Sequence, residues 1–160
     1  MKTLVLGIGN TLLGDDGVGV YAAQALAGRI SEPNITVRDI GVDGLNLLEY
    51  ILGYDRLVVI DAIVTEGGNP GDIYRLKPQP MSETAGLGIS PHHFNLAATL
   101  EIGNRLFPGE MPREVTAFAV EARDVKSITE EMTAEVREAL PRVVEMVMEE
   151  VAIPSSSASR

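Results

Sequence analysis

The sequence predicts an α/β fold: a single three-layer αβα domain whose helices cover both faces of a mostly parallel, twisted sheet of about five strands. Short apolar runs typical of buried parallel strands alternate with segments whose apolar residues recur every three or four positions, as in amphipathic helices. The chain of 160 residues is long enough for one well-packed domain and too short for two ordinary ones.

The first third of the chain predicts two successive strand–helix–strand units. Leu4-Val5-Leu6 is a buried-strand run, and Leu45, Leu48 and Leu52 recur at helical spacing. Strands joined by helices in this way are parallel, with right-handed crossovers. The predicted strands are 2–8, 35–39 and 56–61, and the predicted helices are 16–30 and 43–52.

The middle of the chain predicts an edge of the sheet and a further helix. Residues 72–77 form a candidate antiparallel edge strand after a turn-rich loop, and two prolines and two glycines predict a loop over 78–88. Ser90-Pro91 is a helix-start signal, because serine can cap a helix and proline suits its first position. That helix is expected to continue to Leu106, before a strand over 114–121.

A long amphipathic helix is predicted over 133–151, where valine and leucine recur every three or four residues. Pro141 lies inside it and predicts a kink, or a break near Leu140. The residues that follow are small and polar, with nothing to bury. We therefore expect a domain over 1–152 and a flexible C-terminal tail over 153–160.

Composition excludes several classes of function. The chain has no cysteine, which excludes disulfides, thiol nucleophiles and thiolate metal sites. A formal charge of −10 argues against binding nucleic acid, which needs a basic face. No apolar run approaches the roughly 20 residues that span a bilayer, and the N-terminus resembles a strand more than a signal peptide. We expect a monomeric cytoplasmic protein.

Three polar residues are placed where the predicted fold would bring them together. Asp16 follows the first strand, Asp61 ends the third, and His92 begins a helix. Ligands of open α/β sheets bind beyond the carboxyl ends of the strands, and the helix dipole at its N-terminus keeps an imidazole neutral. Two carboxylates and one imidazole suit a divalent ion such as nickel or zinc, with open positions left over.

Each of these residues also has a structural interpretation. An aspartate is a common helix cap, so the Asp15–Asp16 pair leaves Asp15 to cap and Asp16 to point elsewhere. Asp61 is also explained as a strand-end carboxylate bonded to loop amides. His93, about 100° further round the helix than His92, is expected to face solvent.

The turn Gly7–Gly9 raises a rival hypothesis, a non-proteolytic nucleotide- or dinucleotide-binding module. Asp39 ends the second strand at a distance suited to a ribose. The third glycine of the G-x-G-x-x-G pattern is replaced by Leu12, however, and the two aspartates that follow would repel phosphates.

The same segments carry a family resemblance. Residues 4–17, 59–64 and 89–92 resemble, in order and spacing, the [NiFe]-hydrogenase maturation endopeptidases, and the likeness covers roughly 1–151. It implies a peptidase of the aspartyl type whose metal-binding positions are Asp16, Asp61 and His92. A further family aspartate corresponds to Asp39, so Asp16 and Asp39 are the candidate catalytic residues.

The resemblance also implies a specific reaction. The enzyme would remove a C-terminal extension from the precursor of the hydrogenase large subunit after nickel insertion. Nickel would come with the substrate precursor as the recognition element, with no metal bound permanently to the protease. Two routes to peptide cleavage stay open: nickel polarising the scissile carbonyl while a carboxylate holds the attacking water, or recognition by nickel with acid–base help from Asp16 or Asp39.

Overall fold

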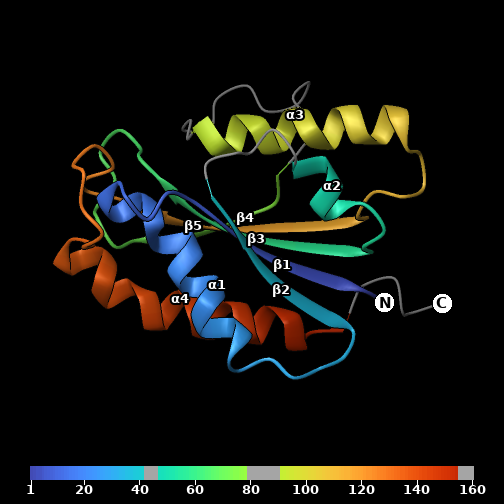
Figure 1. Ribbon diagram of the computed structural model, residues 1–160, viewed down its shortest axis with the longest axis horizontal. Coiled ribbons are helices and arrows are strands. Elements are labelled where there is room, and N and C mark those ends of the chain that lie inside the picture. The colour runs from blue at the N-terminus through green and yellow to red at the C-terminus, as the bar shows by residue number, and fades with distance from the viewer. Residues whose placement is uncertain (42–46, 79–90, 155–160) are drawn as a thin grey trace.

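The computed structural model describes residues 1–41, 47–78 and 91–154, the first five of the last range as backbone alone (Figure 1). A five-stranded sheet in the order β2-β1-β3-β5-β4 forms its centre, and β4 alone runs antiparallel to its neighbour. The mostly parallel sheet and its antiparallel edge strand confirm the predicted fold. The strands are β1 (Thr3–Ile8), β2 (Ile35–Ile40), β3 (Arg56–Ile63), β4 (Ile73–Leu76) and β5 (Glu114–Glu121).

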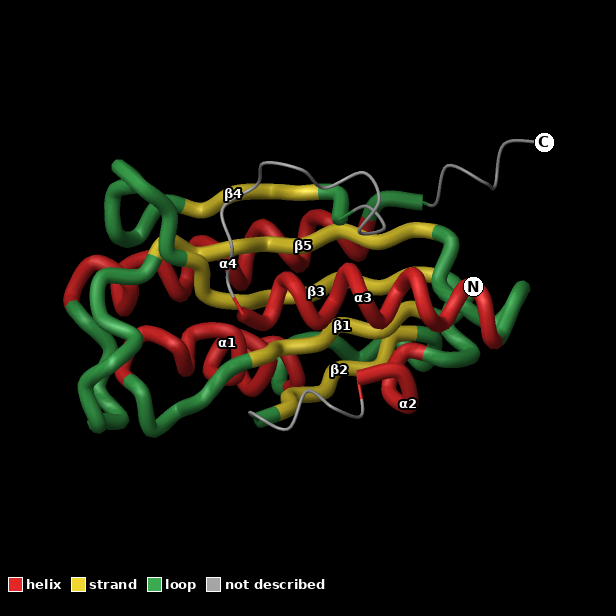
Figure 2. The backbone as a smooth tube through the Cα atoms, turned by 90° about the horizontal axis from the view of Figure 1, so that it is seen from above, coloured by secondary structure: helices red, strands yellow, loops and turns green. Residues whose placement is uncertain are grey.

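Helices cover both faces of this sheet and complete the three layers. One face carries α1 (Val18–Ala27) and α4 (Ala134–Ala152), and the other carries α2 (Leu47–Ile51) and α3 (Pro91–Leu106) (Figure 1). In the view of Figure 2, α3 runs along the length of the strands, with α1 and α4 behind the sheet. A short 3₁₀ helix, η1 (Gly14–Gly17), leads from β1 into α1.

Side chains of the central strands alternate between two hydrophobic cores. In β3, Val58 and Ile60 pack in the core under α1 and α4, whereas Leu57 and Val59 pack in the core under α2 and α3. Every residue of β3 is buried, as expected for a parallel strand covered on both sides. This alternation directs the next side chain, that of Asp61, to the face covered by α3.

Two glycines let α1 lie directly on the sheet. A Cβ at Gly19 would collide with the carbonyl oxygens of Ile8 and Ile60, and one at Gly7 would collide with the carbonyl oxygen of Gly19. The helix therefore approaches the ends of β1 and β3 as closely as backbone allows. This contact fixes η1, and Asp16 within it, relative to β3.

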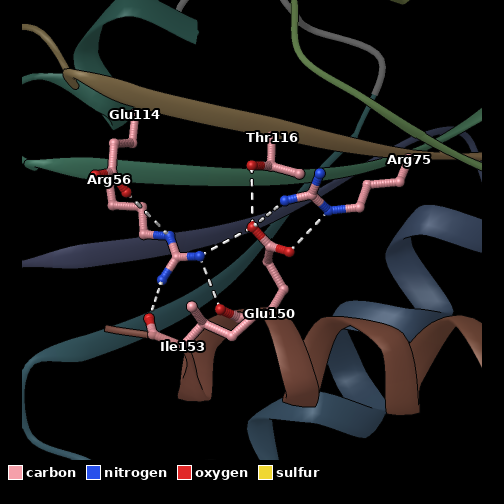
Figure 3. A network of polar contacts seen from close by, with 6 residues as sticks. All are labelled: Arg56, Arg75, Glu114, Thr116, Glu150 and Ile153. Carbon is pink, nitrogen blue, oxygen red and sulfur yellow. Dashed lines mark hydrogen bonds and ion pairs between the residues drawn. The ribbon is translucent and has the colours of Figure 1, made fainter. Parts of the chain in front are cut away.

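A buried ion-pair network joins the end of α4 to the sheet (Figure 3). Arg56 of β3 donates hydrogen bonds to the Glu150 carboxylate and to the carbonyl oxygens of Glu150 and Ile153. Arg75 and Thr116 also donate to the Glu150 carboxylate. The arginine thus donates to two carbonyl groups at the C-terminal end of α4, where the helical hydrogen-bond ladder stops.

Several element boundaries differ from the prediction. The chain enters α1 through the 3₁₀ turn η1, so the α-helix begins at Val18 and ends at Ala27 rather than spanning 16–30. The strand expected to end at Asp61 continues to Ile63. The part of the second helix predicted at 43–46 lies outside the described residues. So do residues 79–88 of the predicted loop and 155–160 of the predicted tail.

Of the two outcomes predicted for Pro141, the break near Leu140 is wrong, and the kink stays a prediction. Helix α4 runs unbroken from Ala134 to Ala152 with Pro141 inside it. A proline in a helix interior costs about 3 kcal/mol. Val136, Val143 and Val147, on both sides of the proline, are fully buried in one core, and their burial offsets that cost.

Within the described parts of the chain, no helix is both long and apolar enough to cross a membrane.

Candidate functional site

Asp16 lies at the carboxyl end of β1, in the 3₁₀ helix η1. Its side chain is 9% exposed, and one carboxylate oxygen accepts the backbone N–H of Asn10 at 3.0 Å. Because η1 also packs against β3, this carboxylate is held beside the ends of two adjacent strands. The structure therefore places Asp16 at the predicted edge of the sheet.

Asp61 lies one strand away, near the carboxyl end of β3. It is 2% exposed, and its Oδ1 accepts the N–H of Ala62 at 2.8 Å. Its neighbour across the strand pair is Ala119 of β5. Since β2 lies on one side of β1 and β3 on the other, Asp16 and Asp61 flank the point where the strand order switches.

His92 lies in the first turn of α3, which begins at Pro91 as the Ser-Pro signal predicts. Helix α3 covers the sheet face toward which Asp61 is directed. The histidine side chain itself lies outside the described residues, so its role as a ligand stays a prediction. Among the side chains that the structure describes, no group of three or more histidines, aspartates or glutamates is placed to hold a metal ion.

Asp39 lies on the other side of the sheet from the face of Asp61. Its carboxylate is exposed and accepts a hydrogen bond from Gln24 of α1 at 3.4 Å. The reason is strand alternation, because Ile35 and Val37 of β2 also pack on the α1 face. The structure therefore does not bring Asp39 together with Asp61, and its catalytic role stays a prediction.

Asp15 has a structural role, but not the helix cap that its position suggests. The residues at the cap positions of η1 and α1 are Leu13 and Gly17. Asp15 is instead fully buried, and its carboxylate accepts the backbone N–H groups of Arg123, Asp124 and Thr133 and the Thr133 hydroxyl. It fixes the loop before α4, more than 100 residues away in the sequence.

Glu121, the last residue of β5, is a further carboxylate at this edge that the sequence interpretation missed. It is 1% exposed, and its Oε1 accepts both the N–H and the hydroxyl of Thr65. Its Oε2 is buried and makes no hydrogen bond with the described residues. Glu121 thereby anchors the loop that follows β3. Its one sequence signal is its position at the end of a predicted strand.

The turn after β1 offers little to a phosphate group. Phosphate-binding loops present free backbone N–H groups, whereas most backbone N–H groups of this turn already donate hydrogen bonds within the protein. The N–H of Asn10 donates to the Asp16 carboxylate, and the N–H groups of Gly14 and Asp15 donate to the carbonyl oxygens of Thr129 and Asp124. The exposed Leu12 also stands where the dinucleotide pattern needs glycine. This geometry argues against nucleotide binding at Gly7–Gly9.

Comparisons with known proteins identify the family. The family model described as hydrogenase maturation protease (HycI) matches residues 20–150. The hydrogenase 2 maturation protease of Escherichia coli K12 is 36% identical over 121 residues, covering 75% of this chain and 73% of that protein. The hydrogenase expression/formation protein HupD of Rhizobium leguminosarum is 33% identical over 147 residues, covering 90% and 71%.

Solved structures that superpose on this chain are also hydrogenase maturation proteases. The hydrogenase maturating endopeptidase HybD of E. coli superposes with a TM-score of 0.81 at 31% identity, over 95% of this chain and 93% of that one. The [NiFe]-hydrogenase maturation protease HybD of Thermococcus kodakarensis gives 0.76 at 26% identity, over 93% and 98%. The chain belongs to the hydrogenase maturation protease family and is a peptidase.

Proposed function

We propose that this peptidase removes the C-terminal extension of a [NiFe]-hydrogenase large-subunit precursor after nickel has been inserted into it. The observation that carries the proposal is the pair of buried carboxylates, Asp16 and Asp61, on either side of the strand-order switch. The family supports a hydrogenase precursor as the substrate. We place the reaction in the cytoplasm, with the protease acting as a monomer.

Nickel in this proposal is part of the substrate. Asp16, Asp61 and His92 would contact the nickel that the precursor already holds and so test whether its active site is loaded. Oxygen and imidazole ligands both suit a borderline divalent ion. Three ligands leave coordination positions for the precursor's own groups, and the chain has no cysteine to compete for the ion. These three ligands are therefore suited to a transient contact with the nickel of the precursor.

Cleavage needs a base for the attacking water. A carboxylate would accept a proton from water as the water oxygen bonds to the scissile carbonyl carbon, and the proton would then pass to the leaving amine. Asp16 is better placed for this role than Asp39, because Asp39 bonds to Gln24 on the face away from Asp61. Nickel contact would add polarisation of the carbonyl.

Isosteric variants test the site without disturbing its packing. Asp16→Asn and Asp61→Asn keep the oxygen that accepts the local N–H but lose the negative charge. With His92→Ala, they are expected to fold normally and to lose processing of nickel-loaded precursor, measured by mass spectrometry of the released peptide. His93→Ala is the matched control and should keep full activity, as should Asp39→Asn if Asp16 is the base. Normal processing by the Asp16 and Asp61 variants would contradict the assignment.

A further inference from the structure

Two large apolar residues are exposed on neighbouring loops at the carboxyl edge of the sheet. Leu12 is 55% exposed and Ile128 is 89% exposed. They come from loops 116 positions apart in the sequence, and the N–H of Thr129 donates to the carbonyl oxygen of Leu12 at 2.9 Å. Leu13 and Thr129 form a β-bridge that keeps the two loops in register. We call Leu12 and Ile128 the apolar tip.

The loops that carry the apolar tip are tied together. The N–H groups of Gly14 and Asp15 donate to the carbonyl oxygens of Thr129 and Asp124. The buried Asp15 carboxylate adds four donors from the loop before α4. Ile128 is 89% exposed on this loop, which hydrogen bonds hold in place, so its side chain contributes little to the core. A fixed apolar surface of this kind lowers the entropy lost when a partner binds.

The apolar tip adjoins the candidate site. Leu12 lies between Asn10, whose N–H bonds to the Asp16 carboxylate, and Asp16 itself. The Asn10 side chain accepts the N–H of Leu12, so the tip and the carboxylate belong to one hydrogen-bonded turn. Val64, half exposed, follows β3 at the same edge. A partner that reaches Asp16 would therefore also meet the tip.

The charge of this edge indicates what kind of partner fits. Leaving out the buried Asp15 and Asp16, the loops 9–17, 64–72 and 122–133 together hold five acidic residues and two basic ones. A second copy of this chain would bring the same acidic surface and would be repelled. The surface suits a different protein, one that offers apolar side chains surrounded by lysine or arginine.

We propose that the apolar tip is the docking surface for the folded body of the hydrogenase large-subunit precursor, separate from the contacts of Asp16, Asp61 and His92 with its nickel. The claim rests on the proposed function. Docking at the tip holds the precursor while its C-terminal segment reaches the carboxylates. The tip therefore contributes to the affinity for the whole precursor and not to the chemical step.

The test compares kinetics of processing on purified nickel-loaded precursor of the organism's own hydrogenase. Leu12→Asp and Ile128→Asp each place a charge on the tip without removing a core contact, and the melting temperature of each variant checks its folding. We expect KM to rise at least tenfold and kcat to change less than twofold. Leu106→Asp is the matched control, because Leu106 is 63% exposed at the far end of α3. Its KM should equal that of the unaltered protein.

The outcomes separate the docking claim from the proposed function. If the unaltered protein processes the precursor and both tip variants show an unchanged KM, the docking claim is overturned and the proposed function stands. A fall in kcat at constant KM overturns it equally. A dimer in sedimentation that Ile128→Asp converts to a monomer assigns the tip to a second copy instead. Failure of the unaltered protein to process the precursor overturns both claims.

Discussion

Removing one partner from the buried Arg56–Glu150 pair should destabilise the protein severely. Arg56 and Glu150 are 4% and 5% exposed and 2.9 Å apart, so Glu150→Ala leaves the buried arginine charge with the longer, 3.8 Å contact to the Glu114 carboxylate. Breaking such a pair costs about 3–5 kcal/mol of the free energy of unfolding. With an unfolding entropy of about 2 cal/mol/K per residue, that loss lowers the melting temperature by roughly 9–15 °C in a chain of 160 residues.

Two controls make this prediction specific. Arg75 also bonds to the Glu150 carboxylate, but its side chain is 45% exposed, so Arg75→Ala should cost only about 0.2–1 kcal/mol. The double variant Arg56→Met/Glu150→Leu removes both buried charges and should cost much less than the single variants Arg56→Ala and Glu150→Ala together. Urea denaturation with linear extrapolation measures all of these values. An equal loss in Glu150→Ala and Arg75→Ala would refute the reasoning.

Further predictions concern packing, the loop before α4 and acid stability. Gly19→Ala should lower the free energy of unfolding by about 1–3 kcal/mol or more, because its Cβ would collide with backbone carbonyl oxygens. Gly28→Ala should be nearly neutral, because its Cβ would meet nothing nearer than 3.8 Å. Thermal unfolding of the two variants measures the difference. Asp15→Ala should cost on the order of 3 kcal/mol, since it leaves buried N–H groups unsatisfied; full stability in urea would contradict this. Burial favours a raised pKa for Glu150, but hydrogen bonds from Arg75 and Arg56 outweigh it and hold the pKa below 4.5. This stabilisation is present above pH 4.5 and lost as pH falls through the lowered pKa, so Glu150→Gln should flatten the acid limb of a stability–pH curve.

The sequence predicted the fold well because the dominant signals are local. The apolar run of β3 and the alternation of β5 need only neighbouring residues to be recognised, and the observed bounds of β5 match the predicted 114–121. The Ser-Pro signal likewise placed the start of α3 at Pro91. Helix α4 also lies where its apolar pattern predicted it, but its continuity through Pro141 could not be predicted, because core packing on both sides of the proline depends on the whole fold.

The candidate site was predictable in part. Asp16 and Asp61 could be placed from strand order alone, since parallel strands bring their carboxyl ends to one edge. The role of Asp15 could not be predicted in this way, because every donor to its carboxylate comes from residues 123–133, more than 100 positions along the chain. The position of Asp39 could be predicted only in part. Its place at a strand end is visible in the sequence, but the sheet face on which it lies depends on the pairing of β2 with β1.

The most direct test of the central claim compares one precursor in two states. The purified large-subunit precursor, with and without nickel in its active site, is incubated with the protein, and the released C-terminal peptide is quantified by mass spectrometry. We expect release from the nickel-loaded form alone, and loss of that release in Asp61→Asn. Equal release from the nickel-free form would contradict recognition of the substrate's nickel by Asp16, Asp61 and His92.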